Sequence, residues 1–299
     1  MVKPATFDQY WQDTLSELSR YPTSAEIEPL PIRSTDFATA YTVRITSLGP
    51  YRLFGYLSIP NAEGPFPTIY YFPKYGSVLE PIPQGAPNYK RSRFVTFALG
   101  GRGMRNSDQP FAAMIPGLLT EGIDDVASYI FRGIVADAVR GLEYVLSRPE
   151  VDSSRVVGWG NDVGLIAAGL TKGLSHLVCT PALFHDTVAS AGRTSSYPLE
   201  EINDYLHAHP ERRGAVAETL SHFDLRDFAK DVGASTLILA EAPGGVHDSE
   251  ALNDLTSALG GPVEVHDSEN SSYKDGLFTE QWVTSQFGYD DVIVPETWQ

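Results

Sequence analysis

Short apolar runs alternate with helical patterns along most of this 299-residue chain, and no other feature restricts the fold as much. In one helical pattern, Ile130, Ile134, Ala138, Leu142 and Val145 recur at four- and three-residue steps, the spacing of an amphipathic helix. Alternating strands and helices predict a mostly parallel sheet with right-handed crossovers. The runs have the length of buried strands and lie at residues 68–72, 94–98, 155–158, 176–180, 235–240 and 263–266.

Two segments flank this central pattern. Residues 41–46 and 51–59 alternate in strand fashion around Gly49-Pro50, which predicts a hairpin and an antiparallel edge of the sheet. Residues 184–228 contain no strand-like run, and we expect them to form a helical insertion that covers one end of the sheet, with short helices near 199–207 and 211–220. Because nothing resembles a linker, we expect residues 1–299 to form a single domain.

Charge and cysteine usage exclude several classes of partner. A formal net charge of −16 repels phosphate backbones and anionic lipid surfaces, so we expect no nucleic acid and no membrane partner. Cys179 is the single cysteine, which excludes an intrachain disulfide and a Cys-rich metal site, and we expect neither a metal nor a cofactor. The first residues have no signal-peptide apolar stretch, so we expect a cytoplasmic protein.

One five-residue string has a chemical interpretation. Gly160-Asn161-Asp162-Val163-Gly164 follows a strand-like run and precedes an Ala/Leu-rich helix, which is the strand–turn–helix context of a nucleophile elbow. The two glycines allow a tight turn and close packing of the helix on the sheet, and Asp162 occupies the tip. The alternative for such a string is an aspartate that caps a helix N-terminus.

Several motifs, in the right order along the chain, make it resemble the acetyl xylan esterase/cephalosporin C deacetylase family. These are Phe7-Asp8-Gln9-Tyr10-Trp11, Gly100-Gly101-Arg102-Gly103, Tyr129-Ile130-Phe131-Arg132-Gly133 and Thr219-Leu220-Ser221-His222-Phe223-Asp224. The resemblance covers nearly the whole chain. It implies an α/β-hydrolase fold, with a mostly parallel central sheet flanked by helices.

The resemblance also implies that the catalytic triad has been replaced. The family's nucleophilic serine falls on Asp162, its acid near Gly244 and its histidine near Ser271. Carboxylate nucleophiles at an elbow still need a histidine to activate water. His247 and His266 lie closest in the sequence to the missing groups, and each is interpreted either as a displaced base or as a surface or strand-end histidine.

Other site residues follow from the same resemblance. Tyr75 matches the family's oxyanion-hole tyrosine, whose backbone N–H acts with that of the residue after the nucleophile, here Val163. Lys74 lies beside that position and suggests a charged substrate group. Trp159 and Phe184 are interpreted either as the lining of an apolar pocket or as core residues. Arg102 and Arg132 are interpreted either as substrate contacts or as buried salt-bridge partners.

Three functional hypotheses remain open at this level. The first is a repurposed biosynthetic enzyme in which Asp162 acts as general acid or base on a small carbonyl-containing molecule, as a lyase, isomerase, dehydratase or cyclase. The second is a residual hydrolase that uses Asp162 with a displaced histidine. The third is a non-catalytic binding or scaffold protein, in which Asp162 is capped and sealed from solvent. The resemblance also implies a homo-oligomer, because the family's members form rings of several subunits.

Overall fold

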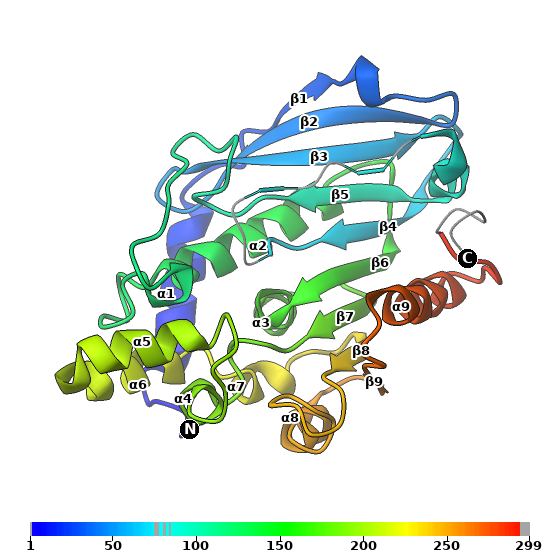
Figure 1. The fold of residues 1–299 in the computed structure, drawn as a ribbon. Coiled ribbons are helices and arrows are strands. Elements are labelled where there is room, and N and C mark those ends of the chain that lie inside the picture. The colour runs from blue at the N-terminus through cyan, green and yellow to red at the C-terminus, as the bar shows by residue number, and fades with distance from the viewer. Residues whose placement is uncertain (1, 75–77, 80–81, 84, 294–299) are drawn as a thin grey trace.

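A nine-stranded sheet runs through the centre of the molecule (Figure 1), in the order β1-β2-β3-β5-β4-β6-β7-β8-β9. The computed structural model describes residues 2–293 except 75–77, 80–81 and 84. The strands are β1 (Glu26–Pro29), β2 (Ala38–Thr46), β3 (Arg52–Pro60), β4 (Phe66–Tyr71), β5 (Val95–Leu99), β6 (Val151–Asn161), β7 (His176–Thr180), β8 (Ser235–Ala240) and β9 (Val263–Asp267).

The sheet has an antiparallel edge and a parallel remainder. β1, β2, β3 and β5 pair antiparallel, whereas all pairs from β5 through β4 to β9 are parallel. The predicted hairpin is confirmed, and Gly49 lies in its turn with a φ of 82°. The eight strands predicted from the sequence are all present. β1 was not predicted because its four residues are mostly exposed and carry no apolar alternation.

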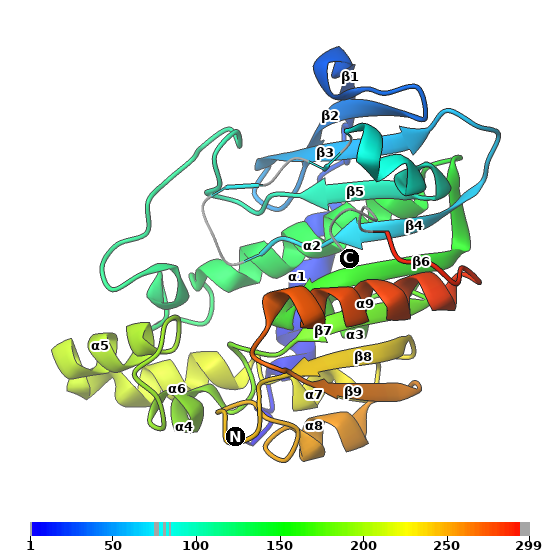
Figure 2. The same ribbon diagram turned by 45° about the vertical axis from the view of Figure 1, so that its right-hand side comes forward.

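Helices cover both faces of the sheet. A large apolar core packs α1, α2, α3 and α7 against one face, and a smaller core packs α9 against the other. Figure 2 shows α9 in front of the sheet with α1, α2 and α3 behind it. The helices are α1 (Phe7–Ser19), α2 (Ile130–Leu146), α3 (Asp162–Leu170), α4 (Thr187–Ala191), α5 (Glu200–Ala208), α6 (Arg213–Ser221), α7 (Arg226–Ala229), α8 (Asn253–Ala258) and α9 (Ser272–Gln286).

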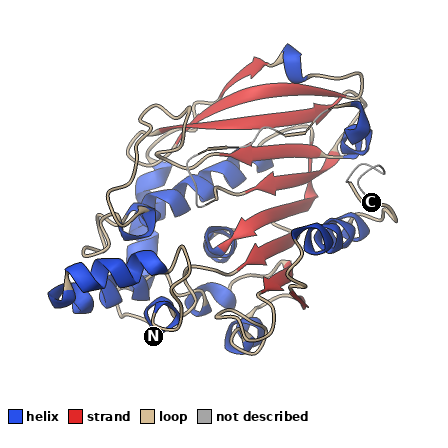
Figure 3. Cartoon of the chain, viewed as in Figure 1, coloured by secondary structure: helices blue, strands red, loops and turns tan. Residues whose placement is uncertain are grey.

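The predicted insertion lies where the parallel strands end. α4, α5 and α6 gather beyond the arrowheads of β6 and β7 (Figure 3), which is the edge where α/β proteins place their sites. α5 and α6 match the two predicted helices, and α4 and α7 are additional short helices. Short 3₁₀ turns complete the fold at Pro31–Arg33, Ala86–Arg93, Leu118–Thr120 and Pro210–Arg212. No helix within the described residues has the length and apolar character needed to cross a bilayer.

Candidate functional site

The predicted elbow joins β6 to α3 at the carboxyl-terminal edge of the sheet. β6 ends at Asn161, whose side-chain oxygen accepts a hydrogen bond of 3.2 Å from the Val163 N–H, and α3 begins at Asp162. A Cβ on Gly160 would lie 2.9 Å from the Phe72 Cβ, and one on Gly164 would lie 2.8 Å from the Phe72 ring. The expectation that these two glycines permit close packing is therefore confirmed.

The Asp162 carboxylate is held by backbone donors from the loop after β7. Its Oδ1 accepts hydrogen bonds from the N–H groups of Leu183 (3.0 Å) and Phe184 (2.8 Å), and its Oδ2 accepts one from Ala182 (3.0 Å). The side chain is 0% exposed. Burial raises the pKa of the Asp162 carboxyl, and these backbone N–H groups lower it in part.

This arrangement differs from the one that the elbow predicts. An elbow projects its tip residue toward a pocket, whereas here the loop after β7 covers Asp162 and occupies both of its oxygens. The N–H of Val163, expected in an oxyanion hole, is engaged by Asn161. Tyr75, the other expected contributor, lies outside the described residues, and its neighbour Lys74 is exposed.

Two aromatic residues, interpreted either as pocket lining or as core residues, pack with the apolar cores. Trp159 is partly buried and lies 5.5 Å from Tyr71, ring centre to ring centre, against the smaller core under α9. Phe184 is fully buried and packs edge-on against Phe131 at 4.9 Å, while its backbone N–H binds Asp162. Core packing therefore accounts for both side chains.

The two arginines make structural ion pairs. Arg102 donates three hydrogen bonds to the buried Asp137, from its backbone N–H (2.9 Å), Nε (3.0 Å) and NH2 (2.7 Å). Arg132 binds Thr14 and Glu17 and so joins α2 to α1. Arg102 also borders a cavity of about 420 Å³ between the loop after β5 and α5; its lining includes Phe111, Leu118, Tyr197 and Glu201.

The structure separates the two histidines considered as displaced bases. His247, in the loop after β8, is 1% exposed, with its Nδ1 3.7 Å from Glu241 Oε1. Burial lowers the pKa of His247, and the nearby charge of Asp162 raises it in part. His266 instead stacks on Phe278 and binds Asp275 at 3.0 Å. Ser271 caps α9 by accepting a hydrogen bond from the Lys274 N–H.

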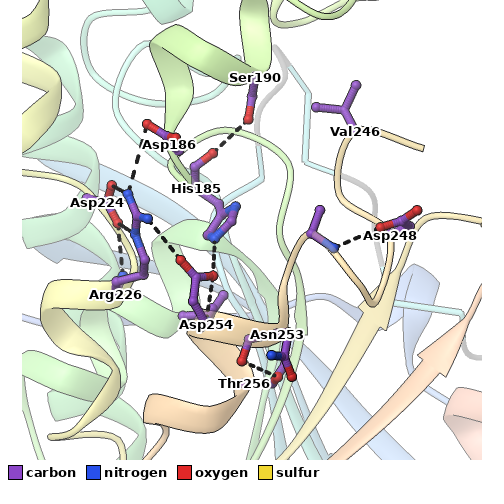
Figure 4. A network of polar contacts seen from close by, with 12 residues as sticks. His185, Asp186, Ser190, Asp224, Arg226, Val246, Asp248, Asn253, Asp254 and Thr256 are labelled. Carbon is purple, nitrogen blue, oxygen red and sulfur yellow. Dashed lines mark hydrogen bonds and ion pairs between the residues drawn. The ribbon is translucent and has the colours of Figure 1, made fainter. Parts of the chain in front are cut away.

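A further polar network was not predicted from the sequence (Figure 4). His185, in the loop after β7, is 4% exposed, and its Nε2 lies 2.9 Å from Asp254 Oδ1 on α8. Arg226 binds the other oxygen of Asp254 at 2.9 Å and also binds Asp224. The one sequence signal for this network was the position of His185 just after a parallel strand. Its partner Asp254 lies 69 residues away along the chain, so no local spacing connects the two residues.

The rings of His185 and His247 lie 6.1 Å apart, centre to centre. His185 Nδ1 and His247 Nε2 are buried and have no hydrogen-bond partner among the described residues. Among the residues that the structure describes, no three His, Cys, Asp or Glu side chains are grouped so that they could hold a metal ion.

Comparison with protein families identifies the chain's relatives. Residues 1–242 match the family model "Acetyl xylan esterase (AXE1)". The acetyl esterase Axe7A of Xylanibacter ruminicola is 24% identical over 307 aligned positions, which cover 97% of this chain. The alignment spans only 66% of that esterase, so the relative is considerably longer.

Solved structures show the same fold. The acetyl xylan esterase from Paenibacillus sp. R4 superposes with a TM-score of 0.82 at 23% identity, covering 95% of this chain and 96% of that one. Acetyl xylan esterase 1 from Thermoanaerobacterium sp. gives a TM-score of 0.81 at 21% identity, with 94% of each chain covered. At these identities the likeness establishes the fold alone.

Proposed function

The chain belongs to the acetyl xylan esterase (AXE1) family of α/β-hydrolase-fold proteins, and from this premise we propose that it binds a small carbonyl-containing molecule without hydrolysing it. The observation that carries the proposal is the position of Asp162. A group that attacks a carbonyl needs a lone pair that the substrate can reach. The carboxylate at this elbow is fully buried and already accepts three backbone hydrogen bonds.

The rest of the expected machinery supports the same proposal. The family's acid and base are expected near Gly244, which has no side chain, and near Ser271, which caps a helix. The Val163 N–H, needed for an oxyanion hole, donates to Asn161. Among the described residues, the Asp162 carboxylate and the Val163 N–H are both engaged, which argues against ester cleavage at this elbow.

The cavity of about 420 Å³ beside α5 is the ligand site that we favour. Its volume suits a small organic molecule. Phe111 and Tyr197 are 39% and 67% exposed and offer aromatic surface, while Arg102 and Glu201 supply polar groups. Such a mixture of apolar surface and a few fixed polar groups is typical of small-molecule pockets.

A second candidate is acid–base catalysis by Asp162 with His247, on a lyase, isomerase, dehydratase or cyclase reaction. The observation in its favour is that the Asp162 charge acts on His247, whose Nε2 is buried without a partner. A residual hydrolase with Asp162 as nucleophile would use the same pair. Both require that the loop after β7 first uncover the carboxylate, which is why we rank them below binding.

Acetate release separates these candidates. With p-nitrophenyl acetate and acetylated xylo-oligosaccharides, we expect the purified protein to release no acetate above the buffer rate. Asp162→Ser should not create activity, because a serine without an aligned base is a poor nucleophile. Acetate release that Asp162→Ala abolishes would overturn the proposal and establish the residual hydrolase.

Binding is tested separately by calorimetry with the same oligosaccharides. We expect Tyr197→Ala to weaken binding at least tenfold, which corresponds to about 1.4 kcal/mol. Tyr273→Ala, at an exposed tyrosine on α9, is the matched control and should bind like the wild type. Equal affinity in both variants would place the ligand elsewhere.

We also propose that the protein forms a homo-oligomer. Light scattering tests this by comparing the particle mass with the 32.7 kDa of one chain.

A further inference from the structure

Two buried histidines lie next to each other where two loops meet at the carboxyl-terminal edge of the sheet. His185 comes from the loop after β7, and His247 from residues 242–252, which we call the β8–α8 loop. The rings meet nearly edge to face, with centres 6.1 Å apart and planes at 73°. In Figure 4 the His185 ring points to Asp254 on one side, and the chain carrying Val246 and Asp248 lies on its other side.

The two imidazoles differ in whether a carboxylate is hydrogen-bonded to them. His185 has a hydrogen-bonded carboxylate, Asp254, which Arg226 fixes in turn. The Nδ1 of His247 lies 3.7 Å from Glu241, whose side chain is 47% exposed, and this distance exceeds that of a hydrogen bond. The His185 backbone also favours the protonated form of His247, but it carries no net charge. The Nε2 of His247 is buried without a partner among the described residues. A proton added to His247 would therefore lack a hydrogen-bonded counter-charge.

Two carboxylates and a second imidazole act on the charge of His247. Asp162, at the start of α3, already accepts three backbone hydrogen bonds, and Glu241, just after β8, accepts one from the His247 backbone N–H at 3.2 Å. His185 repels a cation on the second ring. Among these influences burial is the largest, and it lowers the pKa of His247 below its ordinary value.

The β8–α8 loop is bonded mainly to itself. Its internal bonds include Gly244 N–H to Asp248 Oδ2 (2.8 Å) and Gly245 N–H to the Ala242 carbonyl (2.9 Å). Outside the strand and helix that it connects, Arg193 NH2 donates a hydrogen bond of 3.2 Å to the Val246 carbonyl, and the His185 backbone interacts with His247. The loop is therefore attached to the body mainly by packing: the His247 ring and Leu252 are buried, and Val246 packs against the large core.

We propose that protonation of His247 opens the β8–α8 loop, which we call an acid-operated latch. The loop packs closed while the imidazole is neutral and opens when the imidazole takes up a proton. Opening moves the charged ring into water and away from His185. It also separates His247 from the Asp162 charge that acts on it, so we expect the edge of the sheet beside the elbow to become accessible in mildly acid solution. This inference does not depend on what the protein binds.

Proton binding to His247 and closure of the loop are linked equilibria, and this linkage sets the direction of the pH response. A histidine whose pKa is lowered on folding makes the closed state bind protons less tightly than the open one. Closure is therefore complete above the ordinary histidine pKa of about 6.5 and weakens as the pH falls below it. One proton limits the change in the opening equilibrium to tenfold per pH unit.

Amide hydrogen exchange of the full chain at pH 7.5 and pH 5.5, corrected for intrinsic rates, tests the latch. We expect protection of residues 242–252 to fall about tenfold at the lower pH in the wild type, and to stay unchanged in His247→Gln. His209→Gln, at a partly exposed histidine beside Glu211, is the control and should behave like the wild type. A flat wild-type profile, or the same pH response in His247→Gln, would overturn the proposal.

A second measurement needs no variant. In the imidazole NMR spectrum of the wild type, His247 should titrate below the ordinary histidine range, in step with the exchange of residues 242–252. Titration of His247 without any change in loop exchange would also overturn the latch, whether or not His247→Gln folds.

Discussion

Asp162 and the His185–His247 pair are both buried and polar, and they lie on neighbouring loops, yet their hydrogen bonding is opposite. Both oxygens of Asp162 accept hydrogen bonds from backbone N–H groups of the loop after β7. Each imidazole has one nitrogen without a partner among the described residues. A buried polar group whose hydrogen bonds are formed stabilises the loop that supplies its partners. A buried group with an unpaired nitrogen lowers the stability of the closed structure, so the loop that carries it opens more readily.

This difference reverses what the sequence suggests about the two regions. The elbow motif directs attention to Asp162 as the reactive group, since a carboxylate at that position can act as nucleophile, acid or base. In the folded chain Asp162 instead fastens the loop after β7 to the start of α3. At this edge of the sheet each of the two histidines has a ring nitrogen without a partner among the described residues, and His185 has no motif around it.

The largest expected effect is on stability when Asp162 is removed. Asp162→Ala leaves three buried N–H groups without an acceptor, so we expect the free energy of unfolding to fall by about 2–4 kcal/mol, after allowing for relief of the buried charge. Asp162→Asn keeps an acceptor for Leu183 and Phe184 but turns an amide donor toward the Ala182 N–H. We expect it to cost about 1–2 kcal/mol.

Urea unfolding at pH 7 measures both changes, with Asp204→Asn at an exposed carboxylate of α5 as the control. Wild-type stability in Asp162→Ala would mean that the hydrogen bonds from the loop after β7 do not lock the elbow. The contrast between the two regions would then disappear.

An intermediate effect is expected at Asp254, which supports His185. Burial tends to raise the pKa of the Asp254 carboxyl, but the hydrogen bonds from His185 and Arg226 outweigh it and leave the pKa lowered. We expect Asp254→Asn to lower the free energy of unfolding by about 1 kcal/mol at pH 7. Because a lowered carboxyl pKa stabilises the fold only above its unfolded value, this deficit should shrink as the pH falls below about 4.

Thermal unfolding of Asp254→Asn between pH 3 and pH 7 provides the measurement. A deficit that grows in acid would show that Asp254 is not the anionic partner of His185 and Arg226. Glu218→Gln, on α6 and outside this network, is the matched carboxylate control.

The smallest effect is expected at His247. His247→Leu replaces an incompletely bonded imidazole with an apolar side chain of similar volume, so we expect the free energy of unfolding at pH 7.5 to change by less than about 1 kcal/mol. At pH 5.5 the variant should be the more stable protein, because it has no proton to accept in the closed state. A loss as large as that of Asp162→Ala, measured by urea unfolding at pH 7.5, would place His247 among the structural groups.

Much of the fold could be predicted because its signals are local. The runs that became β4 to β9 and the periodic residues of α2 fix strand and helix through spacing along the chain. The short edge strand β1 escaped prediction, since edge pairing needs no apolar alternation. Trp159 and Phe184 remained ambiguous because an apolar side chain suits a pocket and a core equally well.

The sequence by itself determined the mostly parallel sheet, the hairpin at Gly49 and the position of Asp162 at the β6–α3 turn. Only the tertiary structure decided what Asp162 does, because its donors lie 20 to 22 residues away in the loop after β7. The same holds for His185 and Asp254, which are 69 residues apart. Periodicity specifies which face of an element is buried, but whether a buried polar group finds a partner depends on distant loops that meet only when the chain has folded.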